Sequence, residues 1–128
     1  MNIIWREDKK LKQQLKKIIK KAGVGWVKTS RIFTYRSINA KTRAYARIWG
    51  LSRIWQKALK VDPAYILEVI SEKYDRLSDR EKSKVLLHEV AHIPKNFSGA
   101  LVPHTRRRKG NFRDKLRKLY EDYNSARR

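Results

Sequence analysis

The chain has 128 residues, of which 41% are hydrophobic, so it can bury a core and wholesale disorder is excluded. It has no cysteine, which excludes disulfides and cysteine-ligated zinc fingers, so any metal must be held by His, Asp or Glu. Its 33 lysines and arginines against 12 acidic residues give a net charge of +21, which indicates either a polyanionic partner or a solvated basic surface without one.

The sequence contains no apolar stretch long enough for a secretory signal or a membrane span. We therefore expect a cytoplasmic protein with no membrane partner. We also expect residues 1–128 to form a single domain, because a chain of this length matches the usual size of one folding unit. Nothing in the sequence indicates an oligomeric state.

An amphipathic, lysine-rich helix is predicted over residues 5–21, because apolar residues recur there at spacings of three and four. Two strands are predicted over residues 31–37 and 43–50, and the polar turn between them favours a hairpin. Residues 51–59 form a short helix or an extended connection. The nearly continuous apolar run over residues 65–70 is typical of a strand buried on both faces.

Four tryptophans occur along the chain. Because they are dispersed in the sequence, we interpret them as core or rim residues rather than as a platform on which nucleic-acid bases stack. They are Trp5, Trp26, Trp49 and Trp55.

The next helix is predicted over residues 79–93. Ser78 and Glu81 have the spacing of a capping box, which marks a helix start, and Pro94 ends the helix. Apolar residues form one face of this helix, and we expect that face to pack on the core. The other face would then lie along a cleft.

Two histidines occupy the last turns of this helix. His88 and His92 are four positions apart, so both rings project from one face and can bind a single zinc ion. Glu89 lies between them, close enough to accept a proton from a metal-bound water without being a ligand. This is the H-E-x-x-H pattern of zinc hydrolases. The alternative is a surface helix that carries two ordinary histidines.

A catalytic zinc site needs a third protein ligand and leaves one position for water. His104 is the candidate, because Gly99 allows the loop after the helix to turn back and Pro103 fixes its approach. Glu121 or Asp122, near the end of the chain, are the rival ligands that would replace or join it. The alternative for His104 is an exposed loop histidine.

The basic C-terminal segment extends over residues 105–128. It begins with a dense cationic patch beside the proposed cleft, which we assign as candidate nucleic-acid contacts: Arg106, Arg107, Arg108 and Lys109. Apolar residues at helical spacing then predict a last helix over residues 112–123 that docks on the body of the domain.

The run from His88 to His104 resembles the signature of the phage and archaeal metallopeptidases, small zincins that read H-E-x-x-H-I-P-x-x-F-S-G-x-x-x-P-H. The resemblance covers residues 44–104 and leaves out the N-terminal helix and the arginine-rich tail. It implies a zincin-like α+β fold, one zinc ion held by His88, His92 and His104, and Glu89 as catalytic base. A looser similarity to SprT-like proteases, which act on proteins bound to DNA, rests on the metal motif and the basic charge.

The elements together predict an α+β domain with a mixed sheet of about three strands. This sheet packs on the N-terminal helix and the active-site helix, and a C-terminal helix completes the domain. We expect a zinc-dependent metallopeptidase that hydrolyses peptide bonds in a protein or peptide substrate, with the substrate backbone added beside an edge strand. DNA or RNA is a candidate partner of the basic surface. Three groups are candidates for stabilising the oxyanion: Tyr120, Tyr123 and Arg106.

A basic nucleic-acid-binding protein, in which zinc only stabilises the fold, is the alternative function. A fourth protein ligand, such as Glu121 or Asp122, would favour it, because structural zinc sites have no exchangeable water.

Overall fold

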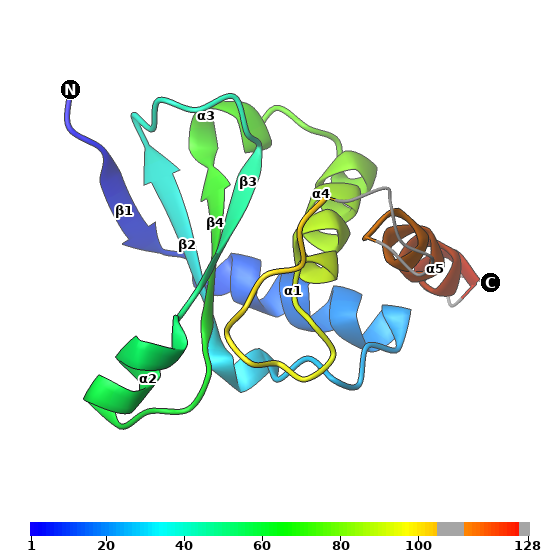
Figure 1. Cartoon of the computed structure of the whole chain (residues 1–128). Coiled ribbons are helices and arrows are strands. Elements are labelled where there is room, and N and C mark those ends of the chain that lie inside the picture. Colours follow the sequence, from blue (N-terminus) through cyan, green and yellow to red (C-terminus); the bar gives the residue numbers. More distant parts are fainter. Residues whose placement is uncertain (105–111, 126–128) are drawn as a thin grey trace.

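Four strands form one mixed sheet in the computed structural model, which describes residues 1–104 and 112–125 (Figure 1). They are β1 (Ile4–Glu7), β2 (Ile32–Ile38), β3 (Ala46–Gly50) and β4 (Tyr65–Ile70). Their order is β1-β2-β4-β3, with β2 and β4 parallel and the other two pairs antiparallel. The predicted α+β class and mixed sheet are confirmed, with one strand more than expected.

The predicted hairpin of residues 31–37 and 43–50 is wrong, because β4 lies between β2 and β3. Ile66 of β4 is opposite Phe33 on one side and Trp49 on the other. β4 has the most continuous apolar sequence of the four strands. The central position covers both of its edges and so buries more apolar surface than a position at the rim of the sheet.

The start of the N-terminal helix also differs from the prediction of residues 5–21. Ile4–Glu7 pairs with β2 as a strand, and the helix α1 spans Lys9–Ala22. Asp8 caps it, because its carboxylate accepts a hydrogen bond of 2.9 Å from the Leu11 N–H. The capping aspartate is the sequence signal for this boundary, and the helical spacing of the residues after it concealed the short strand before it.

Three long helices lie on one side of the sheet (Figure 1): α1, α4 (Asp79–Ala91) and α5 (Phe112–Ser125). Shorter helices follow β3 and β4: α2 (Arg53–Leu59) and α3 (Ser71–Tyr74), and a 3-10 turn, Thr29–Arg31, precedes β2. The helix predicted at residues 112–123 is confirmed by α5. Within the described part of the chain, no helix has the length and apolar character that a membrane crossing requires.

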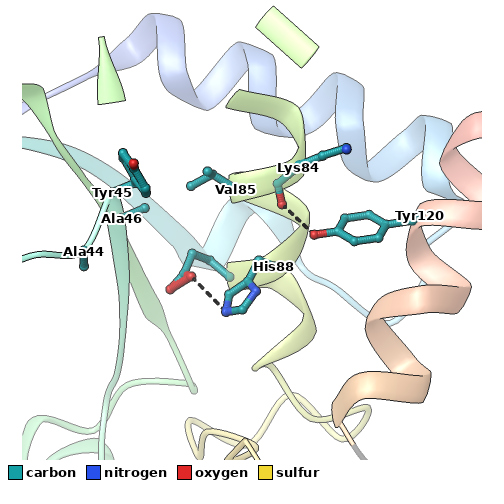
Figure 2. A pocket seen from close by; sticks show the side chains of 8 residues that line it. Ala44, Tyr45, Ala46, Lys84, Val85, His88 and Tyr120 are labelled. Atoms are coloured by element: carbon teal, nitrogen blue, oxygen red, sulfur yellow. Dashed lines mark hydrogen bonds and ion pairs between the residues drawn. The ribbon is translucent and has the colours of Figure 1, made fainter. Parts of the chain in front are cut away.

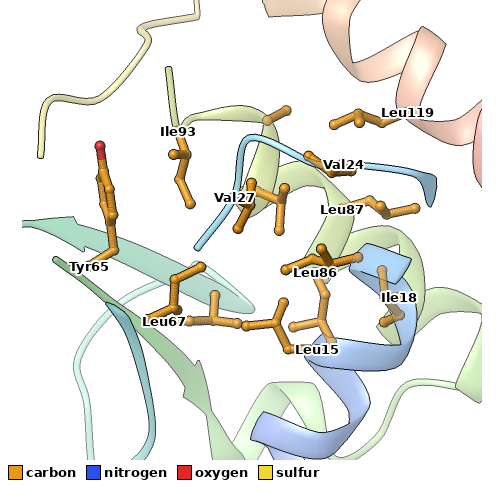
Figure 3. Packing of buried hydrophobic residues seen from close by; sticks show 14 of the residues in the cluster. Leu15, Ile18, Val24, Val27, Tyr65, Leu67, Leu86, Leu87, Ile93 and Leu119 are labelled. Atoms are coloured by element: carbon orange, nitrogen blue, oxygen red, sulfur yellow. The ribbon is translucent and has the colours of Figure 1, made fainter. Parts of the chain in front are cut away.

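The hydrophobic core lies between the sheet and these helices (Figure 3). Leu15 of α1, Leu67 of β4 and Leu86 of α4 meet there, and none is more than 1% exposed. Truncating such a leucine to alanine typically costs about 2–5 kcal/mol. This packing fixes the position of α4, which carries the histidine motif.

The opposite face of the sheet is not packed against α1 or α4. Side chains alternate between the two faces of a strand, so β1, β2 and β3 direct Trp5, Phe33 and Trp49 outward. All three are exposed, although Trp26 packs on the core as predicted. Trp5 and Trp49 are therefore not core residues, and the sheet brings them together on one exposed surface although they are far apart in the sequence.

Candidate metal centre

The helix α4 and its C-cap residue carry the two histidines of the motif. Its N-terminus has the predicted capping box, in which Ser78 and Glu81 exchange hydrogen bonds of 3.0 and 3.2 Å. The helix ends at Ala91 rather than at residue 93. His92 is its C-cap and keeps a helical backbone, so the ring centroids of His88 and His92 are 5.3 Å apart.

The chain after α4 returns to the helix end through Val102. The Val102 N–H donates to the His92 carbonyl, and the His92 ring nitrogen Nδ1 lies 2.7 Å from the Val102 carbonyl. A carbonyl only accepts hydrogen bonds, so Nδ1 carries the proton and Nε2 is left with its lone pair. This pair of bonds fixes both the ring orientation and the approach of His104.

The loop before Val102 is held by buried contacts. Phe97 is buried with a positive φ of 49° and packs edge-on against Tyr65, with the ring centroids 4.9 Å apart. The Tyr65 hydroxyl accepts a bond from the Gly99 N–H and donates one to the Ala100 carbonyl, both 2.8 Å long. A side chain on Gly99 would collide with the Leu51 carbonyl, and φ there is +94°. These contacts explain why the F-S-G part of the motif has phenylalanine at position 97 and glycine at position 99.

The loop brings the third histidine to the other two. Nε2 of His104 lies 2.8 Å from Nε2 of His92, and the potential ligand atoms of His88, His92 and His104 are all within 4.8 Å of one another. At this distance the two ring nitrogens are within hydrogen-bond reach, and a metal ion would take the place of the proton between them. Three neutral imidazoles suit zinc, copper, iron or nickel, so the residues present fit a transition-metal ion.

The electrostatic environment of His88 and His92 keeps these two imidazoles neutral, the form that binds a metal. Burial, with the neighbouring His92 and His104, lowers the pKa of His88 to about 4. Burial also lowers the pKa of His92, against the opposing effect of its bond to Val102.

Glu89 is 8% exposed, and its Oε2 is 4.0 Å from Nε2 of His88. Burial raises the pKa of this carboxyl to about 7. It is not in the group of potential ligands, so the structure places it beside the histidines rather than among them. A carboxyl group in such a place can take up and release a proton near neutral pH.

Two adjoining cavities open between α4 and the edge strand β3, and Glu89 lines both. One of about 300 Å³ contains Tyr45, His88 and Tyr120 (Figure 2). The other, of about 270 Å³, contains Ile48, His92 and Leu101. The predicted cleft is therefore present, with His88 and His92 on one wall and β3 on the other.

The sequence matches the family described as "Putative phage metallopeptidase" over residues 3–124. The chain belongs to this family. The family name indicates a peptidase that uses a metal ion. The match to the phage metallopeptidases also includes α1 and α5, which lie outside the predicted range of 44–104. No curated protein and no solved structure matches the chain.

Phe112, the first residue of α5, is a site residue that the sequence reasoning did not identify. Its ring centroid is 4.3 Å from that of His92, 4.5 Å from that of His104 and 5.1 Å from that of His88. The ring therefore forms an apolar wall against all three imidazoles. Its place at the start of an amphipathic helix indicated burial, but nothing in the sequence indicated this contact.

Lys115, one turn further along α5, is a second such residue. Its ammonium donates a hydrogen bond of 2.5 Å to the Ile93 carbonyl, just after the end of α4, and lies 4.6 Å from the ring centroid of Trp26. Burial, with a smaller effect of Lys95, lowers its pKa to about 8. This bond ties α5 to the segment that carries His92.

The remaining predicted site residues lie away from the histidines or outside the described residues. Glu121 and Asp122 are exposed on α5 and do not belong to the group of potential ligands found in the described residues. Tyr120 lines the first cavity, where its hydroxyl donates to the Lys84 carbonyl at 3.3 Å (Figure 2), whereas the Tyr123 hydroxyl bonds to Ser83. The residues Arg106, Arg107, Arg108 and Lys109 are outside the described residues.

Proposed function

We propose that this chain is a zinc-dependent peptidase in which His88, His92 and His104 hold the ion and Glu89 is the general base. The observation that carries the proposal is the convergence of three imidazoles beside a buried carboxyl group in an open cleft. A zinc ion with three such ligands supplies a Lewis acid that polarises a carbonyl and lowers the pKa of a water molecule to about 7.

Glu89 transfers the proton in this mechanism. It accepts a proton from the attacking water and then donates it to the nitrogen of the leaving amine, while the water oxygen forms the new carboxyl group. A pKa near 7, which burial gives to Glu89, suits a group that must do both at neutral pH. The Val102 carbonyl holds the His92 ring so that Nε2 stays directed at the cluster.

The edge strand β3 is suited to binding the substrate backbone. The Ile70 N–H donates to the Tyr45 carbonyl, so Tyr45 directs its backbone groups toward β4. In an antiparallel ladder the direction alternates, and the N–H and C=O groups of Ala46 and Ile48 therefore point away from the sheet. Both residues line the cleft, where an extended peptide can pair with them as an added strand.

The alternative function, a nucleic-acid-binding protein with a structural zinc site, requires a fourth protein ligand. In residues 1–104 and 112–125, neither Glu121 nor Asp122 joins the histidines. The peptidase is therefore the better-supported proposal. Contacts between the segment Arg106–Lys109 and nucleic acid stay a prediction.

The test compares zinc-loaded wild type with Glu89→Gln on casein. We expect the variant to lose about 10²–10⁴-fold in kcat, the usual contribution of a general base, while it keeps one zinc per chain. Glu121→Gln is the matched control, because it makes the same change at the rival carboxylate and should leave activity and zinc content unchanged. Equal activity of Glu89→Gln and wild type would exclude this role.

A further inference from the structure

The face of the sheet opposite α1 and α4 carries a group of exposed aromatic and apolar side chains, which we call the aromatic face. Trp5 is 55% exposed, Phe33 45%, Trp49 47% and Ile66 40%, and each comes from a different strand. With Tyr35 and Glu68 they line a shallow groove of about 630 Å³. Large exposed apolar surfaces of this kind commonly mark binding sites.

The aromatic face is held in place by a buried carboxylate. Glu68 of β4 is fully buried and accepts hydrogen bonds from the indole N–H groups of Trp5 and Trp49, at 3.3 and 2.9 Å. Arg47 donates two more, at 3.1 and 2.9 Å. These bonds satisfy the polar edge of each indole and neutralise the carboxylate. The surface left to solvent is therefore formed mainly by the carbon atoms of fixed rings.

Two arginines lie against these rings. The guanidinium carbon of Arg47 is 5.1 Å from the ring centroid of Trp49, and that of Arg31 is 5.6 Å from the ring centroid of Phe33. Hydrogen bonds to the carbonyls of Asp62 and Pro63 hold the Arg31 side chain in this position. The charge of Arg47 is paired with Glu68, so the aromatic face combines flat rings with the positive charge of Arg31.

We propose that the aromatic face binds single-stranded nucleic acid, with bases stacked on Trp5, Phe33 and Trp49 and a phosphate near Arg31. The net charge of +21 favours a polyanionic partner and opposes the pairing of two such chains. Exposed aromatic rings stack on unpaired bases, which a duplex does not offer. A four-stranded sheet has room for two or three stacked bases. DNA and RNA share this chemistry.

The proposal goes beyond peptidase activity and does not depend on it. The test is a fluorescence-anisotropy titration with labelled oligothymidylate and oligouridylate, which separates DNA from RNA. We expect Trp5→Ala and Phe33→Ala each to weaken binding on the order of tenfold, because stacking on one ring contributes about that much. Affinity should also fall steeply with added salt.

The matched control is Trp55→Ala. This tryptophan is 59% exposed on α2 and does not line the groove, so its removal should change the affinity less than twofold. Phe33→Leu keeps apolar volume and removes only the aromatic ring, so it should weaken binding without unfolding the protein. Glu89→Gln should bind as wild type does, which keeps this result separate from the peptidase test.

Two outcomes would overturn the proposal. In the first, Phe33→Leu and Phe33→Ala bind both oligonucleotides as tightly as wild type, so that binding depends on charge alone. In the second, a duplex or polyglutamate binds as tightly as the single strands and depends equally on Phe33. That result would assign the aromatic face to another class of polyanion.

Discussion

The Val102 carbonyl lies 2.7 Å from Nδ1 of His92, and the Val102 N–H donates to the carbonyl of the same histidine. One residue of the loop therefore orients the imidazole and also places the chain that leads to His104. Partners that orient a ligating histidine typically contribute 10–100-fold to metal affinity.

Replacing Val102 with proline should weaken zinc binding. Proline has no N–H, so the bond to the His92 carbonyl is lost and the ring loses part of its support. We expect a roughly tenfold lower zinc affinity in a titration against a chelator. Val102→Ala keeps both backbone groups and is the control. Equal affinities of the two variants would show that the backbone bond does not support the site.

Replacing Gly99 with alanine should destabilise the loop. The added Cβ would lie 2.3 Å from the Leu51 carbonyl oxygen, at a φ of +94°. We expect the free energy of unfolding in urea to fall by at least about 1–2 kcal/mol, with a loss of zinc affinity as His104 shifts. Gly25→Ala is the matched control, because its Cβ would meet no atom within 4 Å. A similar stability of both variants would contradict the prediction.

Glu68 should make stability depend on pH in the acid range. Burial disfavours its charged form, but the hydrogen bonds from Arg47 and Trp49 outweigh this effect, so the pKa of Glu68 is lower than usual. The unfolded state therefore takes up the proton first, and stability is lost as the pH falls below about 4.3, the ordinary glutamate value.

The variant Glu68→Gln tests this prediction. At pH 7 we expect it to lower the free energy of unfolding by roughly 2 kcal/mol, because charged hydrogen bonds are replaced by neutral ones. The difference from wild type should shrink as the pH falls through the acid range. Glu7→Gln, at an exposed position of β1, should have little effect at any pH. A difference that stays constant from pH 7 to acid pH would count against the proposed linkage.

Zinc should raise the melting temperature of the wild type. A ligand that binds only the folded state stabilises it by about 2.7 kcal/mol at a concentration of 100 times Kd. Differential scanning fluorimetry should show this shift for wild type and lose it for His92→Ala. Magnesium, which prefers oxygen ligands, should have no effect. An equal zinc shift in the variant would mean that the ion binds elsewhere.

The parts of the site that were predicted from the sequence depend on short-range patterns. The spacing of His88 and His92 and the capping box at Ser78 both act within one or two helical turns, whereas the end of the helix lies at Ala91, two residues before the predicted end. Such patterns are set by helix geometry and need no knowledge of the sheet. The expectation that His104 returns to the helix is matched by its distance of 2.8 Å from His92.

The parts that were missed depend on contacts between distant segments. Trp5 and Glu68 are 63 positions apart and meet only because β4 occupies the centre of the sheet. The order of the strands depends on how much apolar surface the whole sheet buries, and a short stretch of sequence does not reveal this. The contact of Phe112 with the histidines likewise depends on how α5 docks on α4.

The close approach of Gly50 and Gly99 has a consequence for the proposed binding of a peptide along β3. A Cβ on Gly50 would lie 2.0 Å from the Gly99 carbonyl oxygen, so the two main chains touch with no side chain between them. Backbone atoms therefore set the distance between β3 and the loop that contains Gly99, and rotation of a side chain cannot increase it. The distance from a peptide aligned along β3 to the histidines would then be set by backbone atoms and not by side chains.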